Sequence, residues 1–199
     1  RGSLLPILLR VSVALYPPPV SLRVLSARST PSSGVASASF PTAPTTGPLP
    51  NGPGNRRCSF TAYNSGSGNG ELTNVGVLSN LQIGNSGGNV IVSNTGGITT
   101  KSVAASGSVS VTANSPLTIE SGGISAGGNV VLVATNLTSS GNLTLNGPVN
   151  SSGGSVTLSA GSNLTQNSTV YGAAGVTAAA GGTMTIGPGA TTGASPVSY

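Results

Sequence analysis

Apolar and polar residues alternate in short runs along the second half of the chain. Leu-Thr-Ile at 117–119, Leu-Thr-Leu at 143–145, Val-Thr-Leu at 156–158 and Met-Thr-Ile at 184–186 each place a threonine between two apolar residues. In a strand, this alternation sends the two apolar side chains to one face and the threonine to the other. Val and Thr are β-branched and suit a pleated strand. The frequent glycines between these runs would each cost a helix about 1 kcal/mol relative to alanine, so the pattern predicts short strands rather than helices.

A valine that follows small residues marks each repeat of this pattern. Val90, Val109, Val130, Val156 and Val176 are separated by 19, 21, 26 and 20 residues. A second apolar residue follows each valine, eight positions later in four repeats and seven in the third: Ile98, Leu117, Leu137, Leu164 and Met184. The pair Val75 and Ile83 has the same spacing of eight, which predicts an earlier, weaker repeat. The longest interval also contains the extra run 143–145, which we interpret as an enlarged rung or a small insertion.

Short strands, glycine-rich corners and a period near 20 residues are typical of a right-handed parallel β-helix, a form of β-solenoid. The sequence therefore predicts an all-β fold with rungs of about 19–21 residues. Each rung adds about 4.8 Å, so roughly six rungs give a rod of about 30 Å. The alternative is a disordered Gly/Ser-rich segment, but a random low-complexity sequence would not keep the spacing of the apolar pairs.

The first 57 residues differ from the rest in composition. They hold 10 of the 14 prolines and six of the seven basic residues, so their charge is +6, while Lys101 against Glu71 and Glu120 leaves −1 for the remainder. Proline at this density favours extended, irregular backbone. We predict a basic, proline-rich linker or disordered head over 1–57, a transition over 58–74, solenoid repeats over 75–190 and a tail over 191–199.

Three interpretations of the head stay open: a signal-like segment, a native linker, and a damaged or mis-framed N-terminus. The apolar run 4–15 is interrupted by Pro6 and Arg10 and is too short to span a bilayer. The small-residue sequence at 36–38 is similar to a signal-peptidase site but lies far beyond that run. Because the chain does not begin with Met, we expect it to be a piece of a longer reading frame.

The composition disfavours enzyme chemistry. The chain has no histidine, two carboxylate side chains and 5% charged residues, whereas acid–base catalysis needs titratable groups tuned toward neutral pH. Lys101 and Glu120 are the only charges between 72 and 199, and we expect at most a weak surface pair between them. The sequence therefore predicts no enzyme activity, no metal site and no cofactor. A fragment of a β-helical carbohydrate-active enzyme is the catalytic alternative.

Three segments carry a resemblance to a known family: GGNVIVSNTGGITT, GSVSVTANSPLTIESGGISAGGNVVLVATNLT and SSGGSVTLSAGSNLTQ. Over about residues 70–187 the chain resembles the filamentous haemagglutinin-like exoproteins of Gram-negative bacteria, which are adhesins of two-partner secretion systems. The resemblance implies a β-helical stalk segment that is secreted or displayed on the outer cell surface. The family's N-terminal secretion module has no counterpart here, so export by an outer-membrane partner is implied only for a parent protein.

The resemblance also implies a role in attachment to host or neighbouring cells. The expected partner is a cell-surface receptor or glycan, bound through the parent protein. Exposed end rungs present unpaired strand edges, so we also expect self-association. The six arginines of the head are dispersed and lack interleaved aromatic residues, so no specific nucleic-acid binding is expected.

Five asparagines fit the N-glycosylation pattern: Asn136, Asn142, Asn150, Asn163 and Asn167. Some adhesins of this family carry sugars at such positions, but chance is the favoured explanation in a sequence so rich in Asn, Ser and Thr. Cys58 lies beside two arginines, which favour a reactive thiolate, but a lone cysteine in a linker is the simpler interpretation.

Outward threonines suggest one further function. Thr118, Thr144, Thr157 and Thr185 are the candidates for a ladder along one face, and a flat threonine array can order water. An ice-binding solenoid is therefore a second alternative. A solvated strand face explains the same residues, because only 183–185 has the Thr-x-Thr form expected of ice-binding rungs.

Overall fold

The chain folds as a parallel β-solenoid in a computed structural model that describes residues 37–39, 58–65, 68–74, 76–193 and 197–199. The described residues contain strands and turns and no helix, which confirms the predicted fold class. The strands are β1 (Ser37–Ser39), β2 (Cys58–Asn64), β3 (Gly70–Asn74), β4 (Leu78–Asn85), β5 (Val90–Asn94), β6 (Ile98–Ala105), β7 (Val109–Ala113), β8 (Leu117–Ile119), β9 (Ile124–Ala126), β10 (Val130–Ala134), β11 (Leu143–Leu145), β12 (Val149–Ser151), β13 (Ser155–Ala160), β14 (Leu164–Gln166), β15 (Val170–Gly172), β16 (Gly175–Ala180), β17 (Met184–Ile186), β18 (Thr192–Gly193) and β19 (Val197–Ser198).

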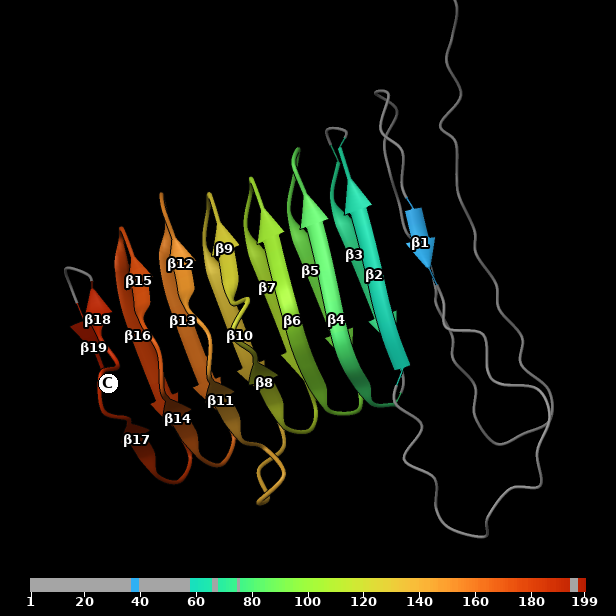
Figure 1. Cartoon of the computed structure of the whole chain (residues 1–199). Coiled ribbons are helices and arrows are strands. Elements are labelled where there is room, and N and C mark those ends of the chain that lie inside the picture. Colours follow the sequence, from blue (N-terminus) through green and yellow to red (C-terminus); the bar gives the residue numbers. More distant parts are fainter. Residues whose placement is uncertain (1–36, 40–57, 66–67, 75, 194–196) are drawn as a thin grey trace, which may run out of the picture.

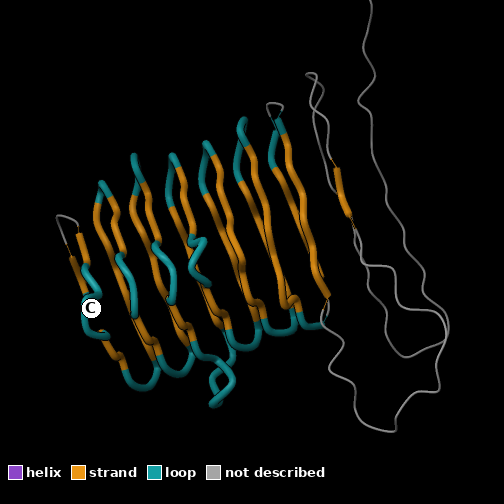
Figure 2. The backbone as a smooth tube through the Cα atoms, viewed as in Figure 1, coloured by secondary structure: helices purple, strands orange, loops and turns teal. Residues whose placement is uncertain are grey.

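The coils stack so that equivalent strands form two parallel sheets (Figure 1). One sheet has seven strands in the order β19-β16-β13-β10-β7-β5-β3. The other sheet has twelve strands. In the early coils a single long strand, β4 or β6, crosses this sheet. From β8 onward a turn divides the corresponding segment of each coil into two short strands. Figure 2 shows the turns aligned along the edges of the stack.

The repeated valines stack in register, as the spacing predicted. Val90 pairs with Val109, Val109 with Val130, Val130 with Val156, and Val156 with Val176 along the seven-stranded sheet. All five are at most 2% exposed, so they form one wall of the narrow core. Side chains alternate between buried and outward positions along each of these strands.

The prediction of Leu137 as the second apolar residue of the third repeat is wrong, because Leu143 occupies that position. Leu143 pairs with Leu117 on one side and Leu164 on the other, and it is fully buried. Leu137 is instead 86% exposed, because it lies in a loop that interrupts the coil between β10 and β11. This loop projects from the edge of the stack in Figure 1. The enlarged rung is therefore an inserted loop, and the run 143–145 is the regular strand.

The stack extends beyond the bounds predicted from the sequence. Strand β3 pairs with β5, and β2 pairs with β4, so part of the predicted transition belongs to the solenoid. In the first full coil Gly70 and Leu78, not Val75 and Ile83, hold the positions of the valine and of the second apolar residue. Ile83 lies further along β4, where it pairs with Val103. Val75 lies outside the described residues. At the far end, β18 and β19 pair with β15 and β16.

The head is described only at β1, which pairs antiparallel with β2 through Ser37–Tyr63 and Ser39–Thr61. This short strand differs from the irregular backbone predicted for that segment. The remaining predictions for the head, including the signal-like interpretation, lie outside the described residues. Cys58 begins β2.

Side-chain amides and hydroxyls connect the coils at the corner before the valine column. The Oδ1 atom of Asn89 accepts from the Ser108 amide at 2.7 Å, and Ser108 Oγ accepts from the Asn129 amide at 3.0 Å. Asn129 Oδ1 in turn accepts from the Ser155 amide at 2.9 Å. At Gly88, a β-carbon would lie 2.3 Å from the Gly68 carbonyl oxygen. The recurring Gly-Gly-Asn sequence is thus explained by close stacking followed by a hydrogen bond to the next coil.

Two asparagine pairs occupy corners inside the early coils. Asn74 and Asn94 are buried, and Asn74 Nδ2 donates to Asn94 Oδ1 at 2.8 Å. Asn94 Nδ2 donates to three backbone carbonyls, at 2.8–3.0 Å. Asn64 Nδ2 similarly donates to Asn85 Oδ1 at 3.1 Å. The Asn94 corner continues in later coils as alanine, which packs in the apolar core, whereas the Asn85 corner continues as alanine and then as Ser151, whose Oγ donates to the Gly128 carbonyl at 2.6 Å.

Candidate functional site

One outward face of the solenoid carries a ladder of five threonines. Thr99, Thr118, Thr144, Thr165 and Thr185 occupy equivalent positions and pair in succession along β6, β8, β11, β14 and β17. Parallel strands lie about 4.8 Å apart, so the ladder runs for about 19 Å along the solenoid axis. The first four side chains are half-buried against their neighbours, and the last is exposed. We call this surface the threonine face.

The structure changes the membership of the predicted ladder. Three predicted members, Thr118, Thr144 and Thr185, stack on the threonine face. Thr157 does not, because it lies in the seven-stranded sheet, where it pairs with Val131 and Thr177. The sequence analysis also missed two members of the ladder. Their strands, Ile-Thr-Thr at 98–100 and Leu-Thr-Gln at 164–166, lack the second apolar residue.

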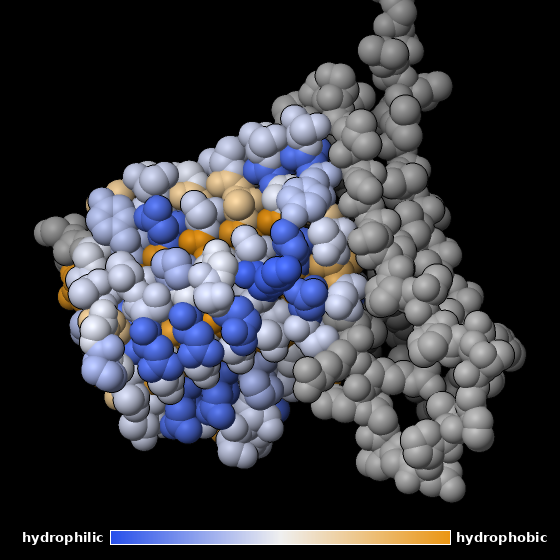
Figure 3. All heavy atoms as spheres, in the orientation of Figure 1, coloured by the Kyte–Doolittle hydropathy of each residue, from blue (hydrophilic) through white to orange (hydrophobic). Residues whose placement is uncertain are grey.

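Asparagines border the threonine face in the middle coils. Asn142 Oδ1 accepts from the Asn163 amide at 3.1 Å, and Asn163 Oδ1 accepts from the Thr183 amide at 2.9 Å. On the other border, Asn167 Nδ2 donates to Asn146 Oδ1 at 3.0 Å. Figure 3 shows strongly hydrophilic side chains gathered in rows on the lower part of the front face. The result is an uncharged polar strip across β11 and β14.

The five predicted glycosylation asparagines fall in different environments. Asn142 Nδ2 donates to the Ser139 carbonyl at 2.9 Å, and Asn167 Nδ2 donates to Asn146 Oδ1. Asn163 is exposed on the border of the threonine face. Asn150 is exposed in the middle of β12. None of these observations tests sugar attachment, which stays a prediction.

Asn136 is presented differently from the other four. It begins the inserted loop, and its Oδ1 accepts from both the amide and the hydroxyl of Thr138, at 2.9 and 2.7 Å. This arrangement is an Asx turn, which leaves the side-chain nitrogen directed away from the turn's hydrogen bonds. The exposed Leu137 lies between the two residues. Of the five positions, this is the one at the start of the inserted loop.

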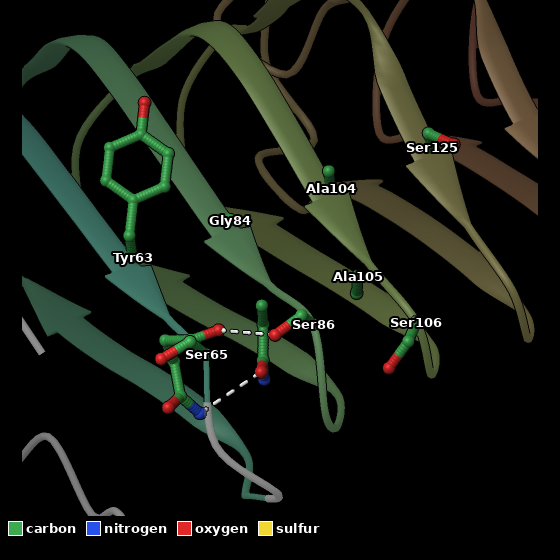
Figure 4. A pocket seen from close by; sticks show the side chains of 10 residues that line it. Tyr63, Ser65, Gly84, Ser86, Ala104, Ala105, Ser106 and Ser125 are labelled. Atoms are coloured by element: carbon green, nitrogen blue, oxygen red, sulfur yellow. Dashed lines mark hydrogen bonds between the residues drawn. The ribbon is translucent and has the colours of Figure 1, made fainter. Parts of the chain in front are cut away.

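A shallow groove crosses the upper part of the twelve-stranded sheet (Figure 4). Its volume is about 440 Å³, and its lining comes from β2, β4, β6, β9 and the turns that follow β2, β4 and β6: Tyr63, Asn64, Ser65, Gly84, Asn85, Ser86, Ala104, Ala105, Ser106 and Ser125. None of these residues is charged. Tyr63 lies at one end of the groove in Figure 4, and Ser125 lies at the other end. We call this feature the tyrosine groove.

Glycine accounts for the position of the Tyr63 ring. Gly84 is the register partner of Tyr63 in the next coil, and a β-carbon there would lie 2.8 Å from Tyr63 Cδ1. The ring therefore packs directly on the backbone of β4 while remaining 50% exposed. The side chain of Gln82 donates a hydrogen bond to the Tyr63 hydroxyl and fixes its orientation. Sequence reasoning missed this site, since no pattern marked Tyr63 or Gly84.

Candidate catalytic chemistry does not gather anywhere in the described part of the chain. Lys101 and Glu120 are both exposed, and neither lines the groove. The described residues contain no group of three His, Cys, Asp or Glu side chains placed to hold a metal ion. Within the same residues there is no helix with the length and apolarity needed to cross a bilayer.

Comparisons of the chain with models of known protein families, with curated proteins and with solved structures found no match.

Proposed function

We propose that the chain is a structural stalk segment of a secreted or surface-displayed bacterial adhesin, which mediates attachment to host or neighbouring cells. The observation that carries the proposal is the in-register stacking of equivalent strands over about six coils. Each coil contacts mainly its neighbours, so such a stack lengthens without needing a larger core. A protein built in this way holds a binding surface at a distance from the point where it is anchored.

The surface chemistry is consistent with this role. The described coils carry three charged side chains in total, Glu71, Lys101 and Glu120, and their faces are covered mainly by Thr, Ser, Asn and small residues. The resemblance of segments within 70–187 to filamentous haemagglutinin-like exoproteins supports the same role. Under this proposal a parent protein leaves the cell through an outer-membrane partner and binds a surface receptor or glycan.

Single-molecule pulling on the full chain tests the stalk role. Coils that unravel one at a time release about 70 Å of contour length for 20 residues, because an extended residue spans up to about 3.5 Å. We expect a series of force peaks with this increment. A single rupture of the entire described region would contradict a stack of nearly independent coils.

Cell attachment is tested separately, with beads that carry the full chain. We expect more of these beads to attach to suspended bacterial or epithelial cells than beads that carry the same chain after heat denaturation. Equal attachment by the two kinds of bead would refute the adhesive role. Sedimentation of the free chain over a concentration series tests the expected self-association through end strands such as β17.

Ice binding is a second candidate function, favoured by one observation. The threonine face carries five threonines that stack at the spacing of the coils, two more than the three predicted members that lie there. Under this candidate the chain shows thermal hysteresis, and Thr144→Lys in the middle of the ladder abolishes it. Thr157→Lys is the matched control, because Thr157 is outward on the opposite sheet. Absence of thermal hysteresis in the unmodified chain would dispose of this candidate.

A further inference from the structure

We infer that the tyrosine groove binds a neutral saccharide, with one sugar ring stacked on Tyr63. This inference deepens the proposed adhesive function, since it assigns the chemical class of a bound partner to a surface within the stalk. It rests on the proposed function only for its biological role. Saccharide binding to the groove is measured independently of cell attachment.

Tyr63 provides the groove with an exposed aromatic surface. Tyr63 packs one side of its ring on the β4 backbone at Gly84 and remains 50% exposed. An exposed tyrosine ring offers an apolar face together with a polar hydroxyl at its edge. The hydrogen bond from Gln82 to that hydroxyl limits rotation of the ring, so little conformational entropy is lost on binding.

Small outward residues form the floor of the groove beside the Tyr63 ring. Gly84 lies under the Tyr63 ring, and the outward positions that follow it along the next two coils, Ala104 and Ser125, are small. Beside the ring they leave a trough that spans the two coil spacings from Gly84 to Ser125, or about 10 Å. Small side chains at these positions let a flat ligand approach the sheet closely (Figure 4).

Serines form a polar edge along one side of the groove. Ser65, Ser86 and Ser106 come from three successive turns and lie along one side of the groove. All three are exposed. Serine hydroxyls both donate and accept hydrogen bonds, as sugar hydroxyls do. An apolar ring face at one end and a row of hydroxyls along the side match a sugar, which has an apolar C–H face and a hydroxyl-bearing edge.

The absence of charge selects the kind of saccharide. None of the ten lining residues carries a formal charge, so an anionic sugar would lose hydration without gaining an ion pair. The volume of about 440 Å³ is within the range of ligand sites for small molecules. An open trough rather than an enclosed pocket suits a segment of a longer glycan chain, and we expect weak binding with a Kd of about 1 mM.

The experiment titrates the purified full chain with maltotriose, cellotriose, chitotriose and N-acetyllactosamine, observed by saturation-transfer NMR. We expect at least one of these neutral probes to bind. Tyr63→Ala and Ala104→Arg should each weaken binding at least about tenfold, the first by removing the ring and the second by filling the trough. Circular dichroism verifies that both variants keep the strand content of the unmodified chain.

Two variants serve as controls. Tyr63→Phe keeps the ring and should retain binding within a few-fold. Tyr171→Ala removes a tyrosine of the same outward column, two coils beyond Ser125, which is 43% exposed, packs beside Gly193 of the next coil and does not line the groove, so binding at the groove should not change. If Ala104→Arg alone fails to fold, the Tyr63 pair still decides the question.

Three results would overturn the inference: no binding of any probe, equal binding by Tyr63→Ala, or binding limited to an anionic heparin oligosaccharide and abolished by salt. The last result would assign binding to the basic head instead. Failure of the saccharide inference is distinguishable from failure of the stalk proposal. Force peaks and bead attachment without saccharide binding would refute only the groove, while saccharide binding without bead attachment would refute only the adhesive role.

Discussion

Replacing Leu143 by alanine is expected to destabilise the solenoid, whereas replacing Leu137 is not. The two residues are close in sequence and chemically identical, and the sequence periodicity favours Leu137 as the core position. The structure instead places Leu143 in the core at 0% exposure and Leu137 on the inserted loop at 86% exposure. This pair of variants therefore tests the register of the whole coil.

The magnitude follows from the surroundings of Leu143. Its side chain lies between Leu117 and Leu164 in the two neighbouring coils, and the backbone ladders on both sides fix the coil spacing. The walls cannot collapse far into the space that alanine leaves, so the cost is expected near the upper part of the range of about 2–5 kcal/mol for buried leucines. Leu137→Ala removes exposed surface only and should stay within about 0.5 kcal/mol.

Urea unfolding followed by circular dichroism measures both changes. We expect a clear fall in the midpoint for Leu143→Ala and an unchanged midpoint for Leu137→Ala. Because stability in a solenoid is summed over neighbouring coils, amide hydrogen exchange should show the loss concentrated in β8, β11 and β14. Equal effects of the two substitutions, or a larger effect of Leu137→Ala, would refute the assigned register.

Three further changes have expected outcomes that thermal or urea unfolding can check. Thr100→Val should stabilise the chain by about 1 kcal/mol, because the Thr100 hydroxyl is buried without a hydrogen-bond partner among the described residues; a loss of stability would contradict this. Gly123→Ala should cost more than Gly189→Ala, although both glycines have positive φ, of 67° and 80°. A β-carbon at Gly123 would lie 2.3 Å from the Pro148 carbonyl oxygen, whereas the one at Gly189 meets open space, so only the backbone strain of about 1–2 kcal/mol applies there. Deleting 137–141, which restores the spacing of neighbouring coils, should preserve the strand content, and its loss would show that the loop is needed for folding.

The stacking of the coils could be predicted because it depends on local patterns. Each valine that follows small residues begins an inward-facing strand, and the apolar-Thr-apolar triplets report the next strand directly. The prediction for Leu137 was wrong because the spacing of eight residues does not hold across the inserted loop. An insertion changes the spacing without changing the chemistry of the strand that follows, so the triplet at 143–145 was the better guide to the core.

The tyrosine groove could not be predicted in the same way. Its position depends on which residue of β4 lies beside Tyr63, and the pairing of β4 shifts register on both sides, with irregularities at Cys58/Ser59 and between Leu78 and Gln82. No periodicity in the sequence reports these irregularities. The buried asparagine pair at Asn74 and Asn94 was missed for a related reason: asparagine is ordinarily a turn residue, and only the stacking brings Asn74 Nδ2 to Asn94 Oδ1 inside the coils.

The scarcity of charge in the coils also has a structural cause. Parallel stacking in register places equivalent side chains about 4.8 Å apart, so a charge repeated at one position would cost about 1 kcal/mol for each neighbouring pair even in water. Glu71 illustrates the solution, since its register partner in the next coil is the uncharged Ile91. Threonine and asparagine meet no such repulsion and can hydrogen-bond to their counterparts. In-register stacking therefore disfavours a run of like charges along one column, and the surface that these coils repeat consists of hydroxyls, amides and small side chains.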